Sequence, residues 1–158
     1  MNLSMTLEAH EMPMGAANRP TLRECQLGSS ACTAYAIIHA GADYLLDLKG
    51  NQGSLHDDVR AFFTDPENLE YARQKGGTVE TVEHHDNGHG RIEKRVCTVT
   101  DWLDWMPAKA RRSWLGHKTI VRIECHTTLP GGKVREDTRY YDDSRPLPTF
   151  IEQPPARL

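Results

Sequence analysis

The side chains best suited to metal chemistry gather in one short segment of the sequence. His84, His85 and His89 are followed closely by Glu93. Imidazole and carboxylate groups ligate zinc and other transition metals. One hypothesis is therefore that the protein is a small metal-dependent hydrolase with its metal in this segment. The turn-forming residues Asp86–Gly88 oppose a helix that would align these side chains, so a turn would have to gather them. The alternative, which we favour, is a solvated hairpin turn.

Other catalytic signatures are weak. Gly50–Gly53 lacks the Gly-Lys-Ser/Thr of a phosphate-binding loop and the glycine spacing of a dinucleotide site, and no Gly-x-Ser-x-Gly elbow occurs. The four cysteines, Cys25, Cys32, Cys97 and Cys125, form no Cys-x-x-Cys pair. In a chain of 158 residues we expect reduced thiols rather than a disulfide framework or a zinc site.

Basic residues cluster locally in a chain that is acidic as a whole. The chain has 19 Lys and Arg against 22 Asp and Glu, a net charge of −3, so nucleic-acid binding would need a local patch. Arg91, Lys94 and Arg95 lie on one predicted strand, and further basic residues lie within 109–112. Phosphate contact is one role for such residues. An ordinary solvated face, with partners such as Glu93, is the other.

The first half of the ordered region reads as helix, strand, helix. Apolar residues at helical spacing predict a helix from Ser29 that stops at Gly41. The nearly continuous apolar run at 43–49 is typical of a central strand. A second helix is expected from Ser54, and Asp65-Pro66 ends it.

The second half is β-like. Alternation predicts antiparallel strands, a turn at 86–88, and a loop with helical turns between Trp102 and Trp114. On the strand from Arg91, alternation places Arg91, Glu93 and Arg95 on one face. The expected strands are 78–83, 91–100, 118–126 and 134–141. Together the elements predict a mixed α/β domain.

Three regions divide the chain. Residues 1–24 carry no pattern and are expected to be disordered or replacement sequence, residues 25–145 form the ordered domain, and residues 146–158 are a proline-rich tail. Since no apolar run approaches 18 residues and no secretory signal is visible, we expect a cytoplasmic protein with no membrane partner.

Several blocks of sequence, in order, resemble one family of proteins. Gly41–Gln52, followed by Leu55–Val59, is similar to a segment of the ISAs-type insertion-sequence transposases, the branch that includes the H-repeat-associated proteins. Gly88–Arg95 resembles the Gly-His-Gly-Arg-Ile-Glu block of that family, and Thr100–Trp105 the block after it. Thr138–Tyr141 resembles the last motif before the family's catalytic helix.

The resemblance, which runs from about Gly28 to Ser144, implies DDE transposition of an insertion sequence on a ribonuclease H-like fold. In the family two Asp and one Glu hold two Mg²⁺ ions that activate the attack on a phosphodiester of DNA. The fold expected for this chain is α/β, a partial ribonuclease H-like fold with a β-rich insertion of antiparallel strands. The residues expected to contact DNA are Lys49, Asn51, Arg91, Lys94 and Arg95.

The chain departs from the family at its catalytic acids. Cys25 stands where the second Asp is expected, and the chain becomes proline-rich where the helix with the Glu is expected. Glu93 belongs to a different motif and is not assigned to catalysis. We therefore expect a central fragment, truncated at both ends, with no catalytic residue and no metal ligand of its own. The alternative is a non-enzymatic module that binds DNA or an intact transposase, associated with the nucleoid when DNA is bound.

Overall fold

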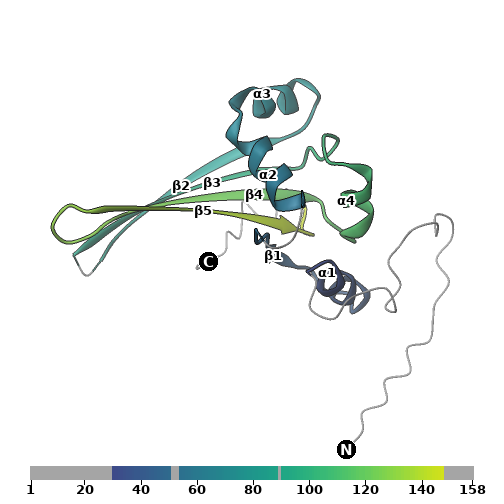
Figure 1. Cartoon of the computed structure of the whole chain (residues 1–158), viewed down its shortest axis with the longest axis horizontal. Helices are drawn as coiled ribbons and strands as arrows, with labels where there is room; N and C mark the ends of the chain where they lie inside the picture. The colour runs from purple at the N-terminus through teal and green to yellow at the C-terminus, as the bar shows by residue number, and fades with distance from the viewer. Residues whose placement is uncertain (1–29, 51–53, 89, 148–158) are drawn as a thin grey trace, which may run out of the picture.

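The computed structural model describes residues 30–50, 54–88 and 90–147. Within them the chain forms a mixed α/β domain around one antiparallel sheet with the strand order β1-β5-β4-β3-β2 (Figure 1). The elements in chain order are α1 (Ser30–His39), β1 (Leu45–Asp47), α2 (Ser54–Thr64), α3 (Pro66–Gln74), β2 (Val79–Gly88), β3 (Arg91–Thr100), α4 (Ala108–Ser113), β4 (Thr119–Thr128) and β5 (Val134–Asp143).

The long strands form two hairpins, β2–β3 and β4–β5, whose far ends project together away from the helices (Figure 1). The expected turn at 86–88 is wrong, because these residues continue β2 as far as Gly88, which lies opposite Arg91. Gly90 supplies the reversal with a φ of +73°. Continuing the ladder to Gly88 pairs more backbone groups than a turn three residues earlier would.

β1 is not the central strand that its apolar run predicts. It spans three residues at the edge of the sheet and pairs with β5 on one side. In the described ranges no strand lies on its other side. The apolar run reports burial rather than strand position: Tyr44 and Leu48, at either end of β1, are buried in the main core.

The two faces of the sheet carry different cores. Ile120 and Tyr140 point toward the helices, and join a cluster of buried residues from α1, α2 and α3. On that face the ring of Phe62 stacks on Trp105 with centroids 4.7 Å apart. Val99, Val121, Tyr141 and Leu147 form a smaller cluster on the other face. Leu147 lies within the expected tail, so the packed domain extends beyond residue 145.

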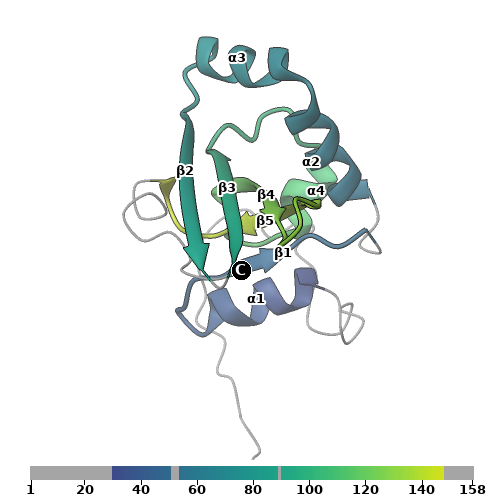
Figure 2. The same ribbon diagram turned by 90° about the vertical axis from the view of Figure 1, so that its left-hand side faces the viewer.

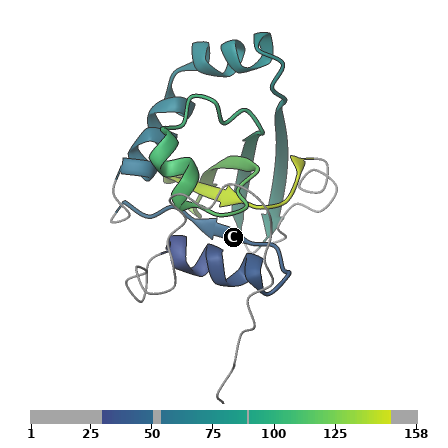
Figure 3. The ribbon, with the colours of Figure 1, turned by 90° about the vertical axis from the view of Figure 1, so that its right-hand side faces the viewer.

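The helices follow the expected pattern with one addition. α1 lies next to β1 (Figure 3), and α2 buries Leu55, Val59 and Phe62 as its spacing predicts. Asp65-Pro66 ends α2 but also begins α3, since the Asp65 carboxylate accepts a hydrogen bond of 2.9 Å from the Glu67 amide. No helix of the described part is long and apolar enough to cross a membrane.

Some expectations fall outside the described residues, and the expectation about the cysteines is wrong at one position. The regions 1–24 and 148–158, with Asn51 and His89, are not described. Cys97 and Cys125 are free thiols. Cys32 is disulfide-bonded, so the expectation of four reduced cysteines fails at that position.

Candidate nucleic-acid interface

The residues expected to contact DNA lie at two places in the fold. Arg91, Lys94 and Arg95 are on β3, in the half of the sheet that projects from the helices. Lys49 is exposed just after β1, and Asn51 lies outside the described ranges. The structure therefore brings three of the five residues onto one strand and leaves Lys49 at the other edge of the sheet.

Alternation along β3 separates these three side chains, as the sequence predicts. Arg91 and Arg95 lie on the same face as Glu93, and both form ion pairs with it, Arg91 Nη2 at 3.6 Å from Glu93 Oε2. Lys94 points to the opposite face, where its Nζ lies 2.8 Å from Glu83 Oε2. One surface thus holds two guanidinium groups, and Lys94 belongs to another.

A hollow of about 190 Å³ lies on the same face as these arginines. It is lined by Glu93, Arg95, Ile123, Cys125, Asp137, Arg139 and Tyr141. Arg139 donates a 3.0 Å hydrogen bond from Nε to Asp137 Oδ2, and this bond raises the pKa of the guanidinium above its ordinary value. Arg139 was not expected from the sequence, although it lies in the Thr138–Tyr141 motif and shares the alternation of Tyr141.

The electrostatics of this face, which we call the arginine face (Arg91, Glu93, Arg95, Asp137 and Arg139), are balanced rather than strongly positive. Each arginine has a carboxylate partner, and the Glu93 side chain is only 8% exposed. A guanidinium carries five N–H donors, and an ion pair with a carboxylate uses at most two of them. The remaining donors can hold phosphate oxygens in fixed positions, while the nearby carboxylates weaken the attraction.

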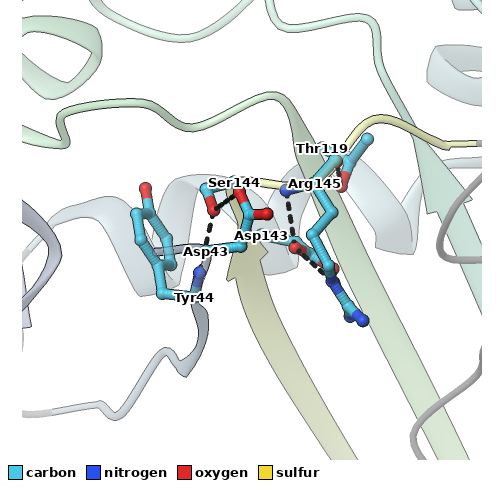
Figure 4. A network of polar contacts seen from close by, with 6 residues as sticks. All are labelled: Asp43, Tyr44, Thr119, Asp143, Ser144 and Arg145. Carbon is cyan, nitrogen blue, oxygen red and sulfur yellow. Dashed lines mark hydrogen bonds and ion pairs between the residues drawn. The ribbon is translucent and has the colours of Figure 1, made fainter. Parts of the chain in front are cut away.

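A polar network joins the segment just before β1 to the end of β5 and the residues that follow it (Figure 4). The amide of Tyr44 donates a 2.8 Å hydrogen bond to Ser144 Oγ, and the Ser144 hydroxyl donates to Asp43 Oδ1 at 2.9 Å. Asp143 is fully buried and accepts from the backbone amide and the guanidinium of Arg145. These bonds hold the end of β5 against the start of β1.

A second buried carboxylate, Asp142, lies next to this network. Its Oδ2 accepts a 3.3 Å hydrogen bond from the Tyr44 hydroxyl and lies 3.9 Å from His117 Nδ1. Burial raises the pKa of Asp142 well above its ordinary value. Burial, together with the positive charge of Arg111, lowers the pKa of His117 to about 4. These shifts favour the uncharged forms of both groups, which suits a structural role.

The described residues do not fit a metal centre. They contain no group of three or more His, Cys, Asp or Glu side chains placed to hold an ion. His84 and His85 are consecutive residues of β2, so they point to opposite faces, and His85 Nε2 contacts Glu83 Oε1 at 2.5 Å. His89 lies outside the described ranges, and among the described residues nothing supports the hypothesis that the histidine cluster is a ligand set.

Comparisons with known proteins give one informative match. The chain is 42% identical over 105 residues to an uncharacterized protein in the dhlA 3'region of Xanthobacter autotrophicus. The match covers 66% of this chain and 32% of that relative, so the chain spans about a third of its relative's length. No family model matches the sequence. No solved structure matches it.

Proposed function

We propose that this chain is a segment of an ISAs-type DDE transposase and forms part of its ribonuclease H-like domain together with a β-rich insertion. One observation carries the proposal: the motifs of the resemblance meet in a single sheet. Residues 41–52 contain β1, residues 88–95 contain the reversal between β2 and β3, and Thr138–Tyr141 belongs to β5, the partner of β1. Antiparallel hairpins between motifs are what a β-rich insertion requires.

The outer edge of β1 gives further support. The Ser144 amide donates a backbone hydrogen bond to the Tyr44 carbonyl, and the Leu48 amide donates one to the Tyr140 carbonyl. The backbone groups of the intervening Leu45 and Asp47 therefore point away from β5. In a complete ribonuclease H-like sheet, additional strands would pair at such an edge. The proposal therefore assigns this position to strands contributed by other parts of the parent protein.

The proposal assigns DNA contact, and not catalysis, to the described residues. DDE chemistry needs carboxylates that hold two Mg²⁺ ions, and the described residues contain no group of three or more such side chains placed to hold an ion. Arg91 and Arg95 would donate hydrogen bonds to phosphate oxygens of a duplex, with Lys49 as a more distant contact. Lys94 lies on the opposite face and is left out of this surface. Such binding would be independent of base sequence, and would place the protein on the nucleoid in the cytoplasm.

The second candidate is a folded, non-enzymatic module that binds DNA or an intact transposase. The observation in its favour is the packing: α1 to α3, β1, β4 and β5 all contribute side chains to one buried cluster. A domain packed in this way unfolds cooperatively, whereas a fragment with an incomplete core melts gradually. Calorimetry of the pure chain therefore separates a self-standing module from a dependent fragment.

Binding to a labelled DNA duplex, followed by fluorescence anisotropy at about 50 mM salt, tests the proposal. We expect weak binding that is independent of sequence and is lost as the salt concentration rises. In the same samples with Mg²⁺ we expect neither nicking nor strand transfer. The absence of binding at low salt would contradict DNA contact, and Mg²⁺-dependent cleavage by pure protein would contradict the assignment as inactive.

A further inference from the structure

The outer edge of β2 is a long strand edge with no partner strand in the part of the chain that the structure describes. β2 has ten residues and, among the described strands, pairs with β3 alone (Figure 2). Just before β2, the Thr78 carbonyl accepts a hydrogen bond from the Asp101 amide, which fixes the alternation along the ladder. The backbone groups of Val79, Thr81, Glu83 and His85 therefore point outward. An edge of this kind is a template for an added strand.

The side chains along this edge are acidic. β2 carries Glu80, Glu83 and Asp86 but no Lys or Arg. The Glu83 carboxylate forms ion pairs with Lys94 and His85. Glu80 and Asp86 lie on the other face, six positions apart, and form no ion pair with any described residue. Two copies of β2 paired edge to edge would bring like charges together, which disfavours a second copy as the partner.

The surroundings of Asp86 also favour the binding of a cation. It lies directly opposite Glu93 on β3, which is an unfavourable pairing of like charges. Glu93 is compensated by Arg91 and Arg95, whereas Asp86 is exposed. Between Glu80 and Asp86 on the same face lies Val82, which is 41% exposed. With His84 between Val82 and Asp86, the edge presents an acidic, an apolar, an imidazole and an acidic position in a row on this face.

We propose that the outer edge of β2 binds an extended basic peptide segment of another protein as an additional strand. The outward backbone groups supply the ladder of hydrogen bonds, as in other cases of strand addition. Two Lys or Arg residues six positions apart face Glu80 and Asp86, and an apolar residue between them covers Val82. Glu80, Val82 and Asp86 lie at the outer edge of the same face that carries Arg91, Glu93 and Arg95, and the proposal does not depend on the proposed contact with DNA.

The competing explanation is that the carboxylates only protect the edge against aggregation. A blocked ten-residue peptide with two lysines six positions apart, in a β-branched background, distinguishes the two. We expect saturable binding of this peptide to the full chain by isothermal calorimetry. A peptide of the same composition with its lysines five apart places them on opposite faces and should bind more weakly. Equal affinity for both peptides, or no binding of either, would overturn the proposal.

Variants of the edge test the mechanism of binding. Thr81→Pro removes an outward N–H without breaking the ladder to β3, and should weaken binding about tenfold, whereas Thr81→Ala should not. Glu80→Gln with Asp86→Asn should weaken binding about two- to fivefold per charge and reduce its salt dependence. Glu136→Gln on β5, which removes one negative charge away from the edge, is the control for the effect of each charge. Unchanged affinity in both edge variants, with melting curves like the wild type, would also overturn the proposal.

Discussion

Tyr44 and Ser144 are 100 positions apart in the sequence, yet the Tyr44 amide donates a 2.8 Å hydrogen bond to the Ser144 hydroxyl. The Ser144 amide returns a bond of 3.0 Å to the Tyr44 carbonyl. This reciprocal pair joins the first strand of the sheet to the last. It closes the domain between two segments that are far apart in the sequence, and it fixes the register of β1 against β5.

Replacing Ser144 by Ala should therefore destabilise the whole domain. The change leaves the buried Tyr44 amide without its acceptor and removes the bond to Asp43. A loss of about 1–3 kcal/mol in the free energy of unfolding is expected. Urea unfolding followed by circular dichroism measures it. Ser113→Ala is the matched control, because the Ser113 hydroxyl bonds the Lys109 carbonyl within its own helix. Equal effects of the two changes would contradict this account of the junction.

The fold shows which features a sequence pattern can predict. Alternation predicts β3, β4 and β5 and the faces of Arg91, Glu93 and Arg95, because side-chain direction in a strand depends on local geometry alone. The position of β1 at the edge could not be predicted in this way, because an apolar run indicates that a strand is buried but not how many strands pair with it. α3 was not expected because Asp65-Pro66 signals both the end of one helix and the beginning of the next.

His117 should make the stability of the domain depend on pH. Its pKa is lowered to about 4, so the folded state binds fewer protons than the unfolded state between that value and about 6.5. The neutral His117 side chain makes its full contribution to the free energy of unfolding above pH 6.5. This contribution is lost as the pH falls from 6.5 through 4, by up to about 3 kcal/mol. His117→Gln should flatten this part of the profile, measured by denaturant titrations across the range. An unchanged profile would contradict the buried, neutral state of His117.

Gly77, between α3 and β2, should tolerate no side chain. A Cβ at this position would lie 2.9 Å from Trp102 Cγ and 3.1 Å from the Ala72 carbonyl oxygen. Gly77→Ala is expected to lower the free energy of unfolding by about 1–3 kcal/mol through overpacking. Gly88→Ala is the control, since a Cβ there meets nothing within 4 Å. Thermal melting of the two variants gives the comparison, and a Gly77→Ala protein as stable as the control would refute the close packing.

Glu93 sets the charge of the arginine face, so its removal should strengthen contact with DNA. Glu93→Gln leaves a side chain of similar size and frees both arginines from their anionic partner. An increase of about threefold to tenfold in duplex affinity at low salt is expected by anisotropy. Glu124→Gln, on the opposite face of β4, is the control for net charge. A fall in affinity, with the fold intact, would contradict the role of Glu93.

The candidate site was predictable in part, for reasons that these residues illustrate. Arg91 and Arg95 share a face because they are two apart from Glu93 on a strand, which the sequence alone indicates. Cross-strand register determines that Lys94 pairs with Glu83. It also determines that Arg139 lines the same hollow as Arg95. Register is fixed by the turn at Gly90 and by the order of the strands, and neither follows from the local pattern.

The salt dependence of duplex binding tests the central claim most directly. Wild-type protein, the double variant Arg91→Ala/Arg95→Ala and Lys94→Ala should be compared by anisotropy, with melting curves to confirm that each is folded. If both arginines contact phosphates, the double variant should lose about 2 from the slope of log affinity against log salt. Lys94→Ala, which removes a charge from the opposite face, should keep the wild-type slope. An unchanged slope in the double variant, or the same loss in Lys94→Ala, would contradict the claim that the arginine face contacts DNA.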